Sequence, residues 1–432
     1  MTTITRRNFL AGATALATAG LAAPALANTT VPSPIRIGTV FPARTGASFI
    51  RASVNDFIGT AGRMGALLAD TQLGTGVEAQ GARLDVLLST SPTVEAAIRA
   101  GERLVETENI CALVGGVGEG QAQVLAEIAA RAQIPFFNVG ETSDAFRREA
   151  ASPYLFHIEA SDAMYLDAMG LLAAEQGLRR WAVVSDTGDR GAALAGRAER
   201  AAEKSGCMIV GTVMVPPALP VYFAEIEELA ALDADVIFVL ADYQDQFPLM
   251  IQMEESGITT PTLSFPHTIT QTRDFIAASR NRLPILNPRH RVALWDTTNT
   301  GPGAEDFNLQ IRARYAEPAD PTAWAAFHAI KIVIDTVMAT GSTEAEAIIA
   351  HLEKPETTFD VAKGVDVSFR PWDHQLRQPL AVLEIDDEVV WRQLQLATRV
   401  DIARYTGSLP AGEPEDDVAQ WLDVLGDGPE EA

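Results

Sequence analysis

The stretch that decides the fold is ICALVGGVGEGQAQVLAEIAARAQIPFFNVGETSD, residues 110–144. Residues 110–114 form a short apolar run of strand length, and four glycines follow at positions 115–120, where the backbone can turn tightly. Apolar side chains at helical spacing predict a helix over residues 121–132, and a second apolar run predicts a strand over 134–139. Parallel strands joined by a helix end on one edge of their sheet, where ligands bind. The stretch therefore predicts an α/β fold with a ligand cleft at this edge.

Polar residues follow both predicted strands of this unit. Glu119 lies in the glycine turn, and Glu141 and Thr142 come after the second strand. A dinucleotide site would need a further glycine at position 121 or 123, and both positions hold glutamine. The pattern therefore favours a cleft for another small ligand, or a plain turn between strand and helix, over a nicotinamide cofactor site.

The N-terminus has the features of an export signal. The sequence TRRNFL at residues 5–10 matches a twin-arginine motif, an apolar stretch covers residues 10–23, and Ala-Leu-Ala at 25–27 suits cleavage. The apolar stretch is too short and too alanine-rich for a membrane span, and no later segment is expected to be long and apolar enough. An uncleaved anchor is the alternative. We predict a mature chain that begins near Asn28 in the periplasm of a Gram-negative cell.

The mature chain is strongly acidic. Residues 1–27 hold Arg6 and Arg7 and no acid, so their removal leaves 31 basic and 57 acidic residues and a net charge of −26. Such a charge repels nucleic acid and anionic lipid, so neither is an expected partner. The length suits two or three domain-sized units, and 47% hydrophobic residues are enough to form their cores.

Strands and helices alternate on both sides of a point near residue 160. The first half adds predicted strands at 35–42 and 83–89 and helices at 49–70 and 93–106. The second half has predicted strands at 181–185, 208–215, 236–241 and 262–265, with helices at 163–176, 191–205, 222–232 and 246–256. Two similar α/β units indicate two lobes rather than one large sheet. Cys111 and Cys207 fall in different units, so two buried thiols are expected rather than a disulfide.

The C-terminal part is less regular. A strand at 292–296 and helices at 306–315 and 322–340 are predicted, followed by a hairpin of strands 377–384 and 388–394. From residue 401 the chain is acidic and rich in glycine and proline. We expect this tail to be mostly extended and loosely attached.

The residues for catalysis or metal binding do not form a recognised pattern. The chain has no G-x-S-x-G elbow and no H-x-x-x-H pair. Glu119, Glu141 and Asp242 could coordinate a hard cation, but carboxylates at strand ends more often bind an amine or water. The loop at 186–189 is too short for a cation loop. No cofactor or metal is therefore expected.

Several stretches together resemble a known family. These are the opening stretch, PYLFHIEASDAM at 153–164, RRWAVVSDTGDRGAALAGRAERAAEKSG at 179–206 and LDADVIFVLADYQDQFPLMIQMEESGI at 232–258. In their order they resemble the periplasmic binding proteins of ABC importers, of the leucine/isoleucine/valine-binding type. The resemblance covers about residues 35–393. It implies a type I fold of two lobes, each a parallel sheet flanked by helices, with the ligand held between lobes that close like a hinge.

The resemblance also implies a domain organisation. The three segments that cross between the lobes are expected near residues 158–161, 296–298 and 371–375. Lobe 1 then comprises 28–160 plus 299–370, lobe 2 comprises 161–298 plus 371–400, and an acidic tail covers 401–432. The implied partners are a small-molecule ligand and the permease subunits of the inner membrane, and the implied state is a monomer without catalytic activity. Two further stretches, WDTTNTGPGAEDFNLQIRARY and VDVSFRPWDHQLRQPL, resemble the subgroup found with PQQ-dependent alcohol dehydrogenases.

Four positions depart from the pattern of the amino-acid-binding members. Glu119 replaces a serine-type hydroxyl, Glu141 replaces a small residue before the matched Thr142, and Arg190 and Asp242 replace tyrosines. Two carboxylates would repel the carboxylate of an amino acid. We therefore expect a cationic, polyol or alcohol-derived ligand rather than leucine.

Two aromatic residues and three alternatives complete these expectations. Phe49 and Trp295 are candidate apolar walls of the cleft, although either could be plain core. The ligand could also contact backbone only, with the charged side chains in solvent. The alternative functions are a periplasmic sensor for a membrane kinase and an exported cofactor-dependent enzyme.

Overall fold

A computed structural model gives the structure of residues 31–42, 54–118, 120–148, 152–272, 290–385, 403–412, 414 and 416–429. The predicted export signal, Phe49 and Glu119 lie outside these described residues.

The first half of the chain forms a five-stranded parallel sheet in the order β2-β1-β3-β4-β5. Its strands are β1 (Ile35–Phe41), β2 (Leu84–Thr90), β3 (Ala112–Gly115), β4 (Phe136–Asn138) and β5 (Leu155–His157). The predicted strands at 35–42, 83–89, 110–114 and 134–139 correspond to β1, β2, β3 and β4. The short strand β5 was not predicted, and it directly precedes the crossing segment expected at 158–161.

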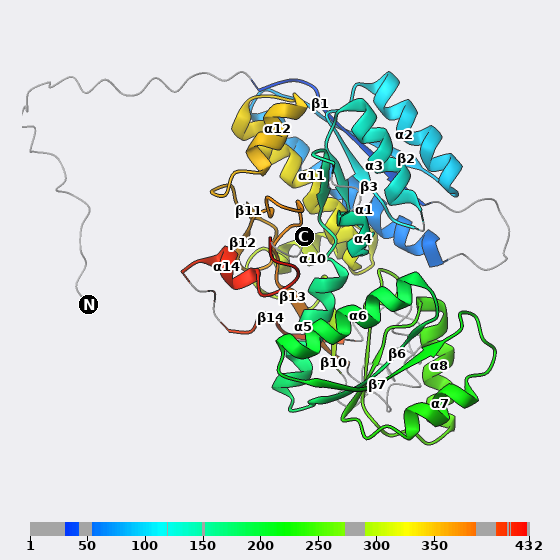
Figure 1. Cartoon of the computed structure of the whole chain (residues 1–432). Helices are drawn as coiled ribbons and strands as arrows, with labels where there is room; N and C mark the ends of the chain where they lie inside the picture. Colours follow the sequence, from blue (N-terminus) through cyan, green and yellow to red (C-terminus); the bar gives the residue numbers. More distant parts are fainter. Residues whose placement is uncertain are drawn as a thin grey trace, which may run out of the picture. The chain divides into compact units, whose positions relative to one another are not determined.

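Helices cover both faces of this first sheet (Figure 1). They are α1 (Val54–Ala79), α2 (Val94–Glu108), α3 (Gln121–Ala132), the short α4 (Asp144–Arg148) and the later α11 (Pro321–Thr340). Successive strand residues point to opposite faces. Phe137 therefore belongs to the core that contains α1 and α11, whereas its neighbour Phe136 belongs to the core formed with α2 and α3.

The second half forms a four-stranded parallel sheet in the order β7-β6-β8-β9. Its strands are β6 (Arg180–Asp186), β7 (Met208–Val215), β8 (Val236–Val239) and β9 (Thr262–Ser264), and its helices are α5 (Asp162–Glu175), α6 (Asp189–Lys204), α7 (Phe223–Ala230) and α8 (Tyr243–Glu255). Val183 belongs to the core with α5 and α6, and Val184 to the core with α7 and α8. The predicted α/β fold with helices on both faces of parallel sheets is thus confirmed.

The remaining elements follow β9 in the sequence. They are β10 (His290–Ala293), α10 (Ala304–Tyr315), α12 (Ala345–Leu352), β11 (Phe359–Asp360), β12 (Asp366–Val367), β13 (Leu380–Ile385), β14 (Ala403–Leu409) and α14 (Val418–Leu422). The strands β10, β13 and β14 form an antiparallel sheet with β13 in the middle. The first strand of the predicted hairpin, 377–384, corresponds to β13, whose two edges pair with β10 and β14, whereas the second strand, 388–394, lies outside the described residues.

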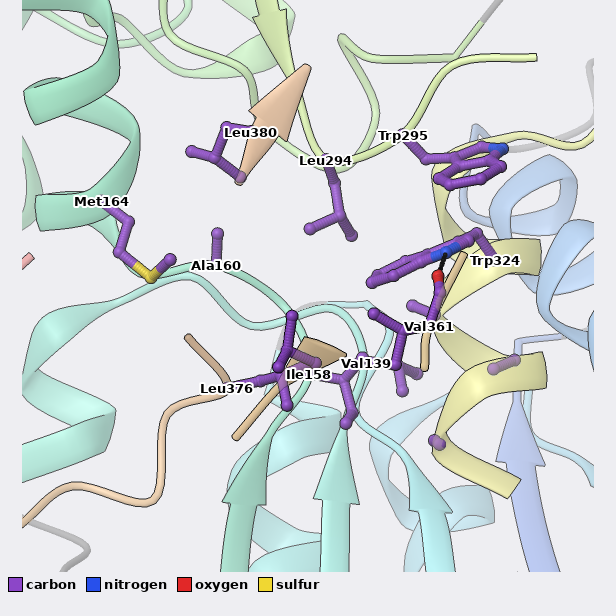
Figure 2. Close-up of a cluster of buried hydrophobic side chains, with 14 of the residues drawn as sticks. Val139, Ile158, Ala160, Met164, Leu294, Trp295, Trp324, Val361, Leu376 and Leu380 are labelled. Atoms are coloured by element: carbon purple, nitrogen blue, oxygen red, sulfur yellow. Dashed lines mark hydrogen bonds between the residues drawn. The ribbon is translucent and has the colours of Figure 1, made fainter. Parts of the chain in front are cut away.

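Segments that are far apart in sequence meet where the chain passes between the two parallel sheets. Figure 2 shows Ile158, Leu294 and Leu376 directed into one apolar cluster. Gln375, at the end of the third predicted crossing segment, pairs with His157 of β5, and β13 begins at Leu380. The three crossing segments and the lobe boundaries stay predictions.

The C-terminal residues are integrated into the fold. Residues 403–409 form β14, and Trp421, Leu422 and Leu425 are buried in the main core. The expectation of a loosely attached tail is wrong for the described residues, because composition alone does not reveal these buried side chains.

The helix α11 differs from the expectation that no segment after the export signal is long and apolar enough to span a membrane. Among the described residues, α11 alone is long and apolar enough to cross a membrane, and 78% of its apolar window is buried inside the fold. At Gly65 of α1, an added Cβ would lie 2.1 Å from the carbonyl oxygen of Ala323, so the two helices approach closely. Packing in the core therefore explains the apolar surface of α11.

The two cysteines have different environments. Both are free thiols, Cys111 buried and Cys207 half-buried. Burial raises the pKa of the Cys111 thiol to about 12. The expectation of two buried thiols therefore holds for Cys111, whereas Cys207 is more exposed than predicted.

Candidate functional site

A cavity of about 500 Å³ lies between loops that follow the strands of the two parallel sheets. The first sheet contributes the glycine turn after β3 and residues 140–142 after β4. The second sheet contributes loops after all four of its strands, including Asp186, Asp242 and Thr268. Carboxyl ends of parallel strands are where open α/β sheets bind ligands. The volume of the cavity is typical of a site for a small organic molecule.

Glycine shapes the wall that the first sheet provides. Gly116 has φ +90°, and an added Cβ there would lie 2.8 Å from Oδ1 of Asn138. An added Cβ at Gly140 would lie 2.8 Å from the carbonyl oxygen of Gly116. The two loops therefore pack backbone to backbone and present main-chain groups to the cavity.

Asn138 at the end of β4 fixes the loop that carries two predicted site residues. Its Oδ1 accepts hydrogen bonds from the backbone N–H groups of Gly140 and Glu141, at 3.2 and 2.9 Å. The Glu141 carboxylate in turn accepts a 2.8 Å hydrogen bond from the Ser143 N–H. Thr142 is buried, and its hydroxyl oxygen accepts a 3.1 Å hydrogen bond from Arg190.

Arg190 lies in the first turn of α6 and pairs with a carboxylate on the neighbouring helix. Its guanidinium makes a two-pronged ion pair with Asp162 at the start of α5, in which Nη2 donates to Oδ1 at 2.7 Å. Burial lowers the pKa of Arg190, but the Asp162 carboxylate outweighs burial and raises it. The positive charge of Arg190 is thus already matched by Asp162.

Three carboxylates lie close together on the second-sheet wall. Oδ2 of Asp186 accepts a 2.6 Å hydrogen bond from the Asp242 N–H, and Asp242 caps α8 by accepting from Gln244 at 3.0 Å. Asp245 accepts from the Ala218 N–H at 3.0 and 3.1 Å. Burial, with the nearby carboxylates of Asp242 and Asp245, raises the pKa of Asp186 to about 6 although the backbone hydrogen bond lowers it. With Glu141 opposite, the cavity is acidic.

Several contacts connect the two walls outside the crossing segments. The Thr268 hydroxyl donates a 2.8 Å hydrogen bond to the Gly140 carbonyl oxygen. Arg190 donates to Thr142, and Arg197 of α6 forms an ion pair with Asp144 of α4. The structure therefore shows the loops of the two sheets in direct contact around the cavity.

Four of the seven predicted site residues line this cavity: Glu141, Thr142, Arg190 and Asp242. Trp295 does not. Its side chain is buried, stacks on Trp324 with ring centroids 5.6 Å apart, and donates to Asn308 at 3.1 Å. Phe49 and Glu119 lie outside the described residues.

Sequence reasoning missed several polar residues of the cavity, among them Asp186, Asp245 and His267. Asp186 ends β6 in the position that the strand-end rule marks, so that rule could have included it. The same rule could have included His267, which follows β9, whereas Asp245 carried no such signal because it lies inside α8. Burial, with Arg190 nearby, lowers the pKa of His267. Within the described ranges, no group of three His, Cys, Asp or Glu side chains is arranged to hold a metal ion.

Comparison with known protein families identifies the family of this chain. A family model described as periplasmic binding protein matches residues 56–389. The chain belongs to the periplasmic binding protein family. The predicted resemblance to the leucine/isoleucine/valine-binding type is thereby confirmed. No curated protein matches the sequence of this periplasmic binding protein.

Solved structures share the fold at low sequence identity. An amino acid ABC transporter substrate-binding protein from Pseudomonas fluorescens is 17% identical with a TM-score of 0.71, covering 90% of this chain and 99% of that one. The substrate-binding protein LivJ from Streptococcus pneumoniae, in complex with isoleucine, is 20% identical with a TM-score of 0.67, covering 86% and 99%. A solute-binding protein from Rhodopseudomonas palustris, in complex with 3,4-dihydroxybenzoic acid, is 15% identical with a TM-score of 0.65, covering 87% and 96%. These likenesses concern the type I periplasmic binding protein fold.

Proposed function

We propose that this periplasmic binding protein is the solute-binding component of an ABC-type importer. It takes one small molecule into the cavity between the two parallel sheets and does not transform it. The observation that carries the proposal is the cavity itself, whose walls come from strand-end loops of both sheets in a chain of this family. The similar proteins are described as components of ABC transporters, which supports permease subunits as the partner.

The charge of the cavity limits the class of ligand. Glu141, Asp186, Asp242 and Asp245 line it, and Arg190, the one arginine among the described residues of its wall, is paired with Asp162. A free carboxylate on the ligand would lose its hydration beside these acids. Because Arg190 is already paired, that cation would not compensate for the loss. A ligand with a positive charge or several hydroxyl donors fits this wall, whereas branched-chain amino acids should bind poorly.

The cellular setting belongs to the same proposal. The twin-arginine motif and the family together support export to the periplasm, where the permease subunits of the inner membrane are accessible. We propose that the exported chain is a monomer. Fractionation of the producing cells tests the export directly: the processed chain is expected in the periplasmic fraction, and a cytoplasmic chain of full length would contradict it.

A thermal-shift panel of amines, polyols, alcohols, amino acids and aromatic acids tests the ligand class. A ligand at about 100 times its dissociation constant adds about 2.7 kcal/mol to the free energy of unfolding. Glu141→Gln keeps an oxygen for the Ser143 N–H and should weaken a cationic ligand. Glu127→Gln on the exposed side of α3 is the matched control and should not.

Two results would contradict the proposal. Tight binding of leucine, isoleucine or valine that survives Glu141→Gln would overturn the acidic-cavity assignment and leave the family function intact. A purified protein that carries a visible or near-ultraviolet cofactor band would instead favour an exported enzyme.

A further inference from the structure

Asp186 is a largely buried carboxylate of the cavity wall. It ends β6, the strand that pairs with β7 on one side and with β8 on the other. Helix connections lead away from that strand in both directions, so a crevice opens at its carboxyl end. Asp186 is 9% exposed and lies in the wall of the cavity at this crevice.

The two oxygens of this carboxylate are not equally satisfied. Oδ2 accepts the 2.6 Å hydrogen bond from the Asp242 N–H. Oδ1 is buried and has no hydrogen-bond partner among the described residues. A buried carboxylate oxygen without a donor is costly, so such a group in a ligand cavity calls for a donor from the ligand.

The charged groups around Asp186 do not supply that donor. The nearest acids, Asp242 and Asp245, are of the same sign and raise its pKa further after burial. Arg190 lines the same cavity, but its guanidinium is engaged by Asp162 and Thr142. Burial lowers the pKa of His267, and its Nε2 lies 3.1 Å from the Ala241 carbonyl oxygen. The wall therefore combines an unsatisfied carboxylate oxygen with a local excess of negative charge.

We propose that Asp186 is the anchor for a positively charged nitrogen of the ligand, an ammonium or a guanidinium. The inference rests on the proposed function and narrows its ligand class. A bare metal ion fits less well, because the described His, Cys, Asp and Glu side chains form no group of three that could hold one. A cavity of about 500 Å³ instead suits an organic cation.

The anchor also gives the ligand an orientation. Asp186 lies on the second-sheet wall, and the glycine turn with Gly116 and Gly118 lies on the first-sheet wall. The cationic end is therefore directed to the second sheet. The uncharged remainder of the ligand contacts the backbone of the glycine loops.

Isothermal titration with a matched set of probes tests this inference. Putrescine, 4-aminobutanol, agmatine and 1,4-butanediol differ in cationic groups at similar length. At least one of the amines should bind, and Asp186→Asn should weaken its binding by about tenfold or more. Asp189→Asn, which removes the same charge at an exposed position of the next turn, should leave binding within about twofold of the wild type.

A pH series on the wild-type chain gives a second readout that needs no substitution. Amine affinity should fall as the pH decreases through about 6, where Asp186 becomes protonated. Binding of an uncharged or anionic compound that is unchanged in Asp186→Asn would overturn the anchor while the proposed function stands. If no compound of any class in the thermal-shift panel binds the folded chain, the proposed function itself fails, and the anchor with it.

Discussion

Glu159, in the first crossing segment, is a fully buried carboxylate that makes folding sensitive to pH. Its Oε1 accepts hydrogen bonds from the Tyr165 hydroxyl at 2.6 Å and from the Ala160 N–H at 3.0 Å, while Oε2 has no partner in the described part of the chain. Burial raises the pKa of Glu159 to about 7, against the lowering effect of these hydrogen bonds, Arg147 and Lys363. Between pH 4.5 and about 7, the folded chain therefore holds a proton on Glu159 that the unfolded chain has lost.

This pKa shift sets the sign of the pH dependence. The contribution of Glu159 is fully present below its ordinary pKa of 4.5 and is lost as the pH rises to about 7. Glu159→Gln should remove this loss, which amounts to at most about 3 kcal/mol over that range. In urea unfolding between pH 4.5 and 8, the free energy of unfolding of the variant should change less with pH than that of the wild type. The same flattening in Glu228→Gln, at an exposed position of α7, would show that Glu159 is not the cause.

At the scale of elements, a buried arginine links the C-terminal segment to α6, beside contacts of Gly426 with Asp167 and Lys204. The Arg197 side chain on α6 is 6% exposed and forms ion pairs with Asp144 of α4 and Asp427 beyond α14. Arg197→Gln leaves two poorly solvated carboxylates without their cation and should cost about 3 kcal/mol or more in the free energy of unfolding. Arg200→Gln, on the exposed side of the same helix, should cost less than about 0.5 kcal/mol.

A double-mutant cycle isolates the attachment of the C-terminal segment. Asp427→Asn removes one acid, and its cost should largely disappear in the Arg197→Gln background if the two side chains act as a pair. Additive effects of the two substitutions in urea unfolding would show that the segment is held by other contacts.

The same segment shows why the sequence predicts some elements and not others. Helices such as α3 and strands such as β7 follow from local periodicity, and they have the predicted bounds. The attachment of β14 depends on β13, and that of Asp427 depends on an arginine 230 residues earlier. No local pattern encodes such pairings. Four of the predicted site residues line the cavity because strand ends are local features, whereas Asp245 lies within a helix and Trp295 proves to be core.

At the scale of the whole molecule, individual hydrogen bonds and an ion pair hold the cavity loops of the two sheets together. Away from the crossing segments these contacts include the Thr268 to Gly140 and Arg190 to Thr142 hydrogen bonds and the Arg197 to Asp144 ion pair. The Asp162 N–H also donates to the Thr142 carbonyl oxygen, and the Ala163 N–H to Asp144. A hydrogen bond of this kind contributes only about 1 kcal/mol net. Closure without a ligand should therefore be marginal, and ligand contacts to both walls should decide it.

Small-angle X-ray scattering tests this closure. We expect the radius of gyration to decrease when the best compound of the thermal-shift panel is added to saturation, because the two sheet units move as rigid bodies about the crossing segments. Thr268→Val removes one contact across the cavity without a change of charge. It should shift the ligand-free protein towards the larger radius and weaken ligand binding by up to about tenfold, the equivalent of about 1.4 kcal/mol. The saturated variant should still reach the compact radius of the wild type. A radius that stays the same with and without ligand, in both proteins, would show that the cavity binds without a hinge.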